Sequence, residues 1–340
     1  MAGEQCASGV VSRALKLISH RGPDSEGIWS SPTGHCVLGH RRLSIIDLSA
    51  HANQPMGSTD SKLHLVFNGE IYNYLELKSE LRADWTFGSE SDTEVLLAAL
   101  AKWGPTCLNR LIAMFAFALW DDEKQELFVA RDRFGVKPLY FTTLPDGTFA
   151  VASEVKALLA LGTPSYPDQV AWATYLAYGL YDHSDRTFWK GINALRPGHS
   201  LRWRDGSISI ERWYDLGDVE ARCEDPRCET QVAEEYMNLM IESVRLRFRS
   251  DVPIGINLSG GWIPPHCLLS FTQSRVPTVP LRLSPLLLAT LVTTSFHGLS
   301  RCSSSPGIRT QFVASLQAKS QSSPREYSGI KTNHLGDCRH

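Results

Sequence analysis

Residues 63–81 read LHLVFNGEIYNYLELKSEL, and within this stretch a strand pattern gives way to a helix pattern. The apolar run 63–67 predicts a strand that ends at an Asn68-Gly69 turn. Residues 74–81 predict an amphipathic helix, because their apolar side chains follow the helical period. A strand followed by an amphipathic helix is typical of layered folds that contain both elements.

The same alternation extends in both directions from this stretch. Further strands are expected at residues 37–38, 114–120, 127–130, 139–142 and 149–152, with an Asp146-Gly147 hairpin turn between the last two. Helices are expected at 11–18, at 92–103 after a Ser91/Asp92 cap, and at 231–248. A Trp-rich hairpin at 203–213, an acidic linker at 215–229 and a buried strand at 252–258 complete the pattern. The predicted class is α+β with mostly antiparallel sheets.

Composition excludes several classes of protein. The chain has 340 residues, enough for about two domains, with 43% hydrophobic and 21% charged residues. A net charge of −2 argues against a nucleic-acid or anionic-membrane partner. The chain contains neither an apolar run long enough for a membrane span nor a signal-peptide pattern at Met1. Its eight scattered cysteines do not form a disulfide pattern, and Cys223 and Cys228 lack the second pair of a zinc site. A soluble cytoplasmic enzyme is therefore expected.

The average composition hides a change at Gly261. Residues 1–261 hold 26 Lys and Arg against 34 Asp and Glu, whereas residues 262–340 hold 8 against 2. The two parts therefore carry net charges of −8 and +6. Residues 262–340 show no sustained helical or strand period, so a disordered tail is predicted there.

Several polar residues stand where the predicted strands and helices end. Arg42, the Asn68-Gly69 pair and Asp92 are the groups that a pocket for a free amino acid requires. A guanidinium can bind the α-carboxylate, a carboxylate the α-ammonium, and an amide with a glycine N–H an oxyanion. Each of these residues is also common as a cap, a turn or a surface charge. His20-Arg21-Gly22-Pro23-Asp24 is as consistent with an exposed turn as with a site, and residues 131–140 (RDRFGVKPLY) predict a structural corner near one.

A second candidate site is the turn after the predicted strand 252–258. Small residues that follow a buried strand can hold a phosphate when a helix begins there. A Ser-Gly-Gly sequence alone is more often an ordinary turn. Its interest lies in the apolar strand before it, and the candidate residues are Leu258, Ser259, Gly260 and Gly261.

The ordered set HRGPDSEG, GHRRLSIIDLS, NQPM, FNGEIYNYLELKSEL, SDTEVLLAAL, MFAFALWD, ARDRFGVKPLY, SEVKALL, RPGH and GINLSGG lies within residues 16–261. Together these strings resemble the glutamine-dependent asparagine synthetases, which are class II glutamine amidotransferases. The resemblance implies an N-terminal-nucleophile αββα sandwich over residues 1–200, without its N-terminal strand. It further implies a hairpin and linker at 201–230, the first helix and strand of an α/β ATP-pyrophosphatase domain at 231–261, and a non-homologous tail at 262–340.

The resemblance also implies an activity and its residues. Members of the family release ammonia from glutamine and use ATP to convert aspartate into asparagine, AMP and pyrophosphate. Glutamine, aspartate and ATP are thus the implied partners, ATP and Mg²⁺ the implied cofactors, and a homodimer is left open; no metal ligand is identified in this chain. The implied residues are Arg42, Leu43, Ser44, Ile45 and Ile46 around the glutamine carboxylate, Asn68 and Gly69 as the oxyanion hole, Glu70 and Asp92 at the glutamine amino group, and Leu258, Ser259, Gly260 and Gly261 at the ATP pyrophosphate.

Two departures from the family put the activity of this chain in doubt. The family nucleophile is a cysteine at position one whose own amine is the base, whereas Ala2 follows Met1 here and Cys6 lies inside the chain. The family continues Ser-Gly-Gly with a hydrophobic residue and Asp-Ser, where this chain has Trp262-Ile263-Pro264. Reading these codons one base earlier encodes a hydrophobic residue, an obligatory Asp and a permitted Ser, so a frame change after Gly261 is predicted. An impaired synthetase fragment is expected; the alternatives are a non-catalytic glutamine-binding or dimerisation module, and another class II amidotransferase.

Overall fold

The computed structural model describes residues 2–218 and 227–254, with side chains from Ser8 onward. All of these residues belong to one unit, residues 1–287, and a second unit covers residues 288–340 outside the described part. The predicted tail and the Leu258–Gly261 turn therefore lie outside the described residues.

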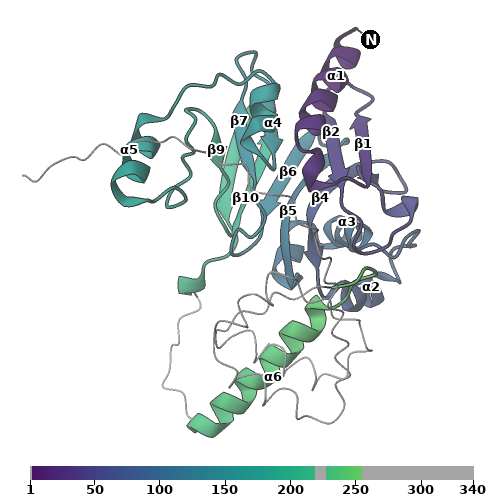
Figure 1. The fold of residues 1–340 in the computed structure, drawn as a ribbon. Coiled ribbons are helices and arrows are strands. Elements are labelled where there is room, and N and C mark those ends of the chain that lie inside the picture. Colours follow the sequence, from purple (N-terminus) through teal and green to yellow (C-terminus); the bar gives the residue numbers. More distant parts are fainter. Residues whose placement is uncertain (1, 219–226, 255–340) are drawn as a thin grey trace, which may run out of the picture. The chain divides into compact units, whose positions relative to one another are not determined.

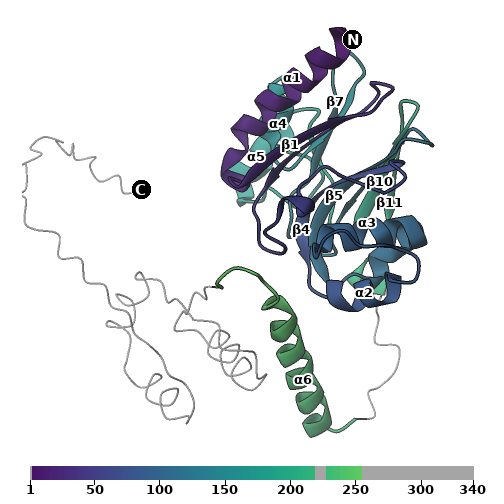
Figure 2. The same cartoon turned by 90° about the vertical axis from the view of Figure 1, so that its right-hand side faces the viewer.

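A six-stranded antiparallel sheet lies at the centre of the domain (Figure 1), with the strand order β11-β10-β6-β5-β4-β3. Its longest strands pair in register, with Phe67 opposite Phe117. Helices α2 and α3 cover one face of this sheet, as Figure 2 shows. The elements of these two layers are β3 (Met56–Gly57), β4 (Leu63–Ile71), α2 (Tyr74–Leu81), α3 (Asp92–Trp103), β5 (Ala113–Asp121), β6 (Glu126–Arg131), β10 (His199–Arg204) and β11 (Ser207–Arg212).

Two smaller sheets form the next layer, one of order β1-β2 and one of order β8-β7-β9. Helix α1 packs on β2 and α4 on β8, and the two helices contact each other. Helix α5 follows α4, and α6 lies beyond the linker. The bounds are α1 (Ala2–Leu17), β1 (Ser25–Ser30), β2 (Val37–Arg42), β7 (Tyr140–Thr143), β8 (Phe149–Ala152), α4 (Val155–Ala160), α5 (Gln169–Tyr178), β9 (Asn193–Ala194) and α6 (Glu229–Arg247).

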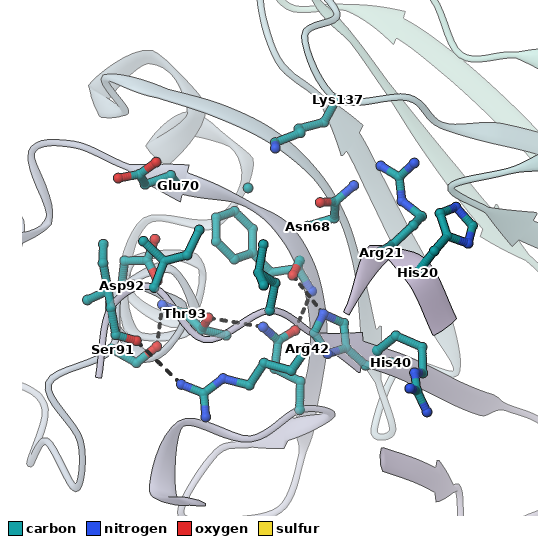
Figure 3. A pocket seen from close by; sticks show the side chains of 17 residues that line it. His20, Arg21, His40, Arg42, Asn68, Glu70, Ser91, Asp92, Thr93 and Lys137 are labelled. Carbon is teal, nitrogen blue, oxygen red and sulfur yellow. Dashed lines mark hydrogen bonds between the residues drawn. The ribbon is translucent and has the colours of Figure 1, made fainter. Parts of the chain in front are cut away.

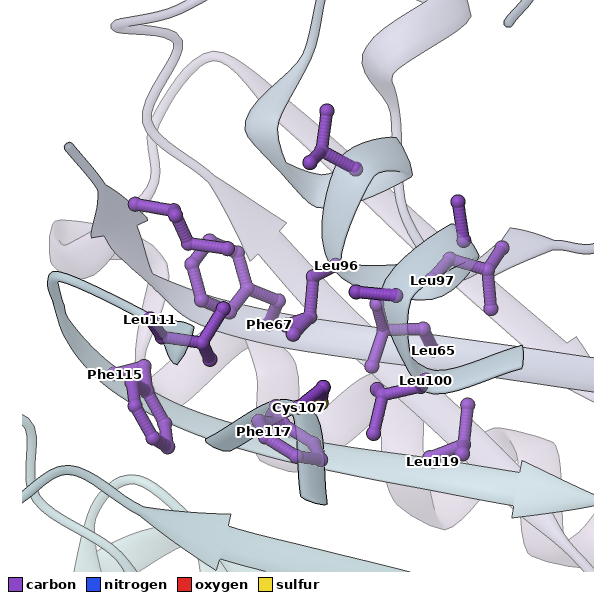
Figure 4. Close-up of a cluster of buried hydrophobic side chains, with 14 of the residues drawn as sticks. Leu65, Phe67, Leu96, Leu97, Leu100, Cys107, Leu111, Phe115, Phe117 and Leu119 are labelled. Atoms are coloured by element: carbon purple, nitrogen blue, oxygen red, sulfur yellow. The ribbon is translucent and has the colours of Figure 1, made fainter. Parts of the chain in front are cut away.

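Alternating side chains of the central strands fill two separate cores. Phe67 of β4 and Phe115 and Phe117 of β5 face α3, where they pack with its leucines (Figure 4). The intervening residues face the smaller sheets, where Trp120 packs with Leu38 of β2. A third core lies under α4. Helix, sheet, sheet and helix thus follow one another, which confirms the predicted αββα sandwich.

Two local predictions were wrong. The strand predicted at 63–67 does not turn at Asn68-Gly69 but runs to Ile71, because Gly69 permits close approach of β5. A Cβ at Gly69 would lie 2.3 Å from the Met114 carbonyl oxygen. The helix predicted at 11–18 begins at Ala2.

The other predicted elements lie within a few residues of those observed. Helices α2 and α3 match their predicted ranges, and Ser91 caps α3 by accepting from the Thr93 N–H. Residues 252–254 are not in a strand, and the rest of the strand predicted at 252–258 is outside the described residues. Strand β1 and helices α4 and α5 were not predicted, since they are short or lack a clear apolar period.

Candidate functional site

A cavity of about 350 Å³ lies where β2, β4 and the start of α3 meet (Figure 3). Its walls come from two of the three sheets, from the start of α3 and from the loops beside them. The lining residues are His20, Arg21, His40, Arg41, Arg42, Leu43, Ile45, Ile46, Gln54, Phe67, Asn68, Gly69, Glu70, Ser91, Asp92, Thr93 and Lys137.

Two carboxylates line this cavity. Asp92 begins α3, is 6% exposed, and accepts a hydrogen bond from the Ile71 N–H at 3.0 Å. Burial raises the pKa of Asp92 to about 6. Burial, together with the negative charge of Asp92, raises the pKa of Glu70 to about 7. Above these pKa values both acids are ionised, and two carboxylates in the wall of one cavity can then hold a cationic ligand group.

Asn68 and Gly69 of β4 line the cavity together with the two carboxylates. Because side chains alternate along a strand, Asn68 and Glu70 lie on the same face of β4. The side-chain nitrogen of Asn68 is buried without a hydrogen-bond partner in the described part of the chain. A buried N–H₂ donor is costly to leave unpaired, so Asn68 is ready to donate to a ligand oxygen.

His40 of β2 carries a hydrogen-bond acceptor, whereas Asn68 carries a donor. Burial lowers the pKa of His40 to about 4, so its ring is neutral at neutral pH. Its Nε2 lies 3.1 Å from the Phe67 carbonyl oxygen, which can only accept, so Nε2 carries the proton. The other nitrogen, Nδ1, is then an acceptor, and it is buried without a partner among the described residues. Two residues of the cavity wall thus carry a buried polar atom without a partner among the described residues, a donor on Asn68 and an acceptor on His40.

The loop that follows β2, residues 43–49, forms another wall and is held by Arg42. Asp47 within it adopts a φ of 55°, a backbone conformation uncommon outside glycine. Arg42 is 6% exposed, and both terminal guanidinium nitrogens donate into this region. Their acceptors are the carbonyl oxygens of Ile46, Asp47 and Ser49 and the side chain of Asn53. The guanidinium of Arg42 was predicted to bind the carboxylate of a ligand. In the structure, its two terminal nitrogens bind the carbonyl groups that shape the 43–49 loop.

Cationic groups stand at the remaining wall. Glu154, at the start of α4, accepts hydrogen bonds from His20 and Arg21 at 2.8 and 3.0 Å. Burial opposes ionisation of Glu154, yet hydrogen bonds from Lys156, Arg21 and His20 lower its pKa to about 2. Lys137 lines the cavity from the corner 131–140, and burial lowers its pKa. The placement of this corner beside the site agrees with its sequence prediction.

The structure brings together most of the predicted glutamine-site residues. Arg42, Leu43, Ile45, Ile46, Asn68, Gly69, Glu70 and Asp92 all line the cavity. Ser44 does not line the cavity, and its N–H donates to the Asp24 carboxylate. Sequence reasoning assigned no role to His40 or Gln54, whose positions at a strand end and in a loop carry no distinctive spacing.

The remaining predicted groups concern ATP and metal. Leu258, Ser259, Gly260 and Gly261 lie outside the described residues. Within 2–218 and 227–254, no three His, Cys, Asp or Glu side chains cluster closely enough to hold a metal ion. In the same ranges, no helix is both long and apolar enough to cross a bilayer.

Comparison with protein families identifies the domain. A family model described as a glutamine amidotransferase domain matches residues 2–214. The chain belongs to this family. The match covers the whole four-layer sandwich and the cavity, so the pocket described above is that of a glutamine amidotransferase domain.

Curated relatives extend beyond the amidotransferase domain. The chain is 38% identical to the amidase chry2 of Gibberella zeae over 73% of its own length and 36% of the relative's. It is 36% identical to the glutamine-hydrolysing asparagine synthetase 1 of Bacillus subtilis, over 74% and 39% of the two lengths. The chain therefore spans less than half of either relative. Among solved structures, the glutamine phosphoribosylpyrophosphate amidotransferase of B. subtilis aligns with a TM-score of 0.45 and 19% identity, over 79% of this chain and 61% of that one.

Proposed function

We propose that the cavity binds free glutamine. The observation that carries this proposal is the meeting of two carboxylates, Glu70 and Asp92, with an unpaired donor on Asn68 and an unpaired acceptor on His40. Glutamine carries an ammonium group at one end and a carboxamide at the other, and both have counterparts in this set of groups.

Each end of glutamine has a proposed partner. The carboxylates of Glu70 and Asp92 take the α-ammonium. The carboxamide oxygen accepts from Asn68 and from the Gly69 N–H, and the carboxamide nitrogen donates to His40 Nδ1. Glutamate has no N–H at this end, so it would leave His40 unpaired and place a charge in a buried site.

The α-carboxylate is proposed to lie against the 43–49 loop. Arg42 supplies positive charge behind this loop and fixes its shape through the bonds to its carbonyl groups. Arg21 and Lys137 contribute further positive charge to the cavity. Their positive charge offsets the negative charges of Glu70, Asp92 and the α-carboxylate of the ligand.

For a protein with the full length of these relatives, we propose the asparagine synthetase reaction. Glutamine is hydrolysed to glutamate and ammonia, and ammonia displaces AMP from an aspartate activated by ATP, giving asparagine, AMP and pyrophosphate. Glutamine, aspartate and ATP are the proposed partners, with Mg²⁺ as the metal that accompanies ATP. Similarity to the asparagine synthetase of B. subtilis supports this choice of reaction.

Calorimetric titration of the 340-residue chain with glutamine and with glutamate tests the binding proposal. We expect saturable binding of glutamine and at least tenfold weaker binding of glutamate, because an unpaired buried acceptor costs about 1–3 kcal/mol. Equal affinities for the two amino acids would contradict the assignment of the carboxamide end.

The same sample should release ammonia slowly or not at all. The amine of Cys6 is a peptide amide and cannot act as a base, so this thiol lacks the family's means of activation. Burial raises the pKa of Cys36 and of Cys107 to about 12, which keeps both protonated at neutral pH. Ammonia release that is saturable in glutamine and abolished by Cys6→Ser would show that Cys6 is the nucleophile and refute this expectation.

Glutamine affinity should decrease at acid pH. Ammonium binding needs ionised acids, and these are ionised above their pKa values of about 7 for Glu70 and about 6 for Asp92. We expect roughly tenfold weaker binding at pH 6 than at pH 8, since protonation of Glu70 removes the competent form. In Glu70→Gln, the decrease in glutamine affinity that remains should centre near pH 6, the pKa of Asp92. A flat profile between pH 5 and 8 would show that neither acid contacts the ammonium.

A further inference from the structure

The segment that follows α6 contacts the wall of the glutamine cavity, although it lies some two hundred positions further along the chain. The Asp47 N–H donates to the Asp251 carboxylate at 2.7 Å. The Asp251 N–H in turn donates to the Ile45 carbonyl oxygen at 3.0 Å. One residue therefore bonds the backbone of the 43–49 loop at two points, and one of them, Ile45, lines the cavity.

The fixed geometry of Asp47 makes these bonds important for the loop. Its φ of 55° is uncommon for a residue with a side chain and persists only where the surroundings hold it. The carboxylate of Asp47 accepts from the Ser49 and Glu90 N–H groups, at 2.9 and 2.8 Å. Asp251 satisfies the N–H of the same residue, so Asp47 is bonded from both its backbone and its side chain.

Arg249 makes a second set of contacts, with α2 and with the chain just before it. Its two terminal nitrogens donate to the two carboxylate oxygens of Glu76 on α2, each at 2.5 Å. One of them also donates to the Tyr72 carbonyl oxygen at 2.6 Å. The Arg249 side chain is 14% exposed and that of Glu76 is 52% exposed, so the two hydrogen bonds form a bidentate ion pair at the edge of the surface. Tyr72 lies two residues after Glu70, so this contact fixes the chain next to the carboxylate.

Neighbouring residues reinforce the same junction. The guanidinium of Arg247 lies 4.7 Å from the centre of the Tyr72 ring. Leu246, in the last turn of α6, is 5% exposed. Arg247 and Arg249 thus contact the segment 70–76, and Asp251 bonds the 43–49 loop.

We propose that Arg249 and Asp251 are positioning residues that hold the 43–49 loop and the segment 70–76 in the form that binds glutamine. Through them, the chain that follows α6 is coupled to the glutamine cavity: any movement of this segment changes the affinity for glutamine. The inference rests on the proposed glutamine binding, and it assigns to residues outside the amidotransferase family match a role in that site.

Three variants of the full chain test this coupling. Asp251→Ala removes the acceptor of the Asp47 N–H, while Asp251→Asn keeps a side-chain oxygen that can accept from it. Glu234→Ala removes an exposed carboxylate of α6 and is the matched control. For each, glutamine affinity is measured by calorimetry, and exchange of the backbone amides of residues 43–49 is measured by mass spectrometry without ligand.

We expect Asp251→Ala to weaken glutamine binding about tenfold and to speed exchange in the 43–49 loop about tenfold, with an unchanged thermal transition. For Asp251→Asn, both the glutamine affinity and the exchange rate should stay within about threefold of the wild-type values. For Glu234→Ala, both should equal the wild-type values. Wild-type affinity and exchange in Asp251→Ala would overturn the proposal. Failure of the wild type to bind glutamine would instead refute the proposed function, and the exchange data would still decide whether Asp251 holds the loop.

Discussion

Replacing Asp132 with alanine is expected to lower the free energy of unfolding by roughly 3–5 kcal/mol, because four backbone donors, one buried and three partly buried, lose a charged acceptor together. Asp132 is 1% exposed. Its two carboxylate oxygens accept from the N–H groups of Phe115, Phe134, Val136 and Lys137 at 3.0–3.1 Å. The first of these belongs to the central strand β5, so the carboxylate joins the corner 131–140 to the sheet.

Urea unfolding followed by tryptophan fluorescence measures this loss. Asp146→Ala is the control, because Asp146 also accepts a turn N–H, from Thr148, but in an exposed hairpin. Asp146→Ala should shift the urea midpoint little. The midpoint of Asp132→Asn should lie between those of Asp146→Ala and Asp132→Ala, since its side chain keeps one acceptor oxygen. An Asp132→Ala midpoint equal to that of the control would contradict the structural role of the carboxylate.

Asp92→Asn is expected to weaken glutamine binding by about thirtyfold or more while the fold is retained. The change keeps the shape of the side chain and an oxygen for the Ile71 N–H, but removes the charge that we pair with the α-ammonium. A hydrogen bond to a charged group contributes about 1.5–3 kcal/mol, and 1.4 kcal/mol corresponds to a factor of ten in affinity. Calorimetry at pH 8, where both cavity acids are ionised in the wild type, gives the cleanest comparison.

A second carboxylate on the same helix provides the control for Asp92. Glu94 is also buried, but its oxygens accept from the Gly88 and Ser89 N–H groups and not from a cavity group. Glu94→Gln should therefore lower stability with little effect on glutamine affinity at temperatures where the domain stays folded. Equal affinities for wild type and Asp92→Asn would place the ammonium elsewhere in the cavity.

Much of the fold could be predicted from the sequence because its central elements have strong local patterns. The range of α3 follows from its Ser91 cap and apolar period, and the β7–β8 hairpin from Asp146-Gly147. The prediction failed at Asn68-Gly69, where the pair usually marks a turn but the strand continues because a neighbouring backbone needs the space. That requirement arises from tertiary packing and has no trace in local sequence.

The candidate site shows the same division between local and non-local information. Glu70, Asp92 and the Asn68-Gly69 pair stand in conspicuous positions along the chain, and the structure brings them to one cavity. The bonds of Arg42 to the 43–49 loop, the tautomer of His40 and the contact from Asp251 depend on residues distant in sequence. Only folded geometry reveals them.

The position of the cavity at the junction of two sheets has a consequence for how this protein can change over evolution. His40 of β2 donates to Phe67 of β4 across the junction, while Leu38 and Trp120 pack behind it in the shared core. Because protein interiors are close-packed, a change of side-chain volume in that core shifts one sheet against the other. Substitutions at residues that do not contact the ligand can therefore change which ligand is preferred. Selection on the site thus also acts on residues of the hydrophobic interior.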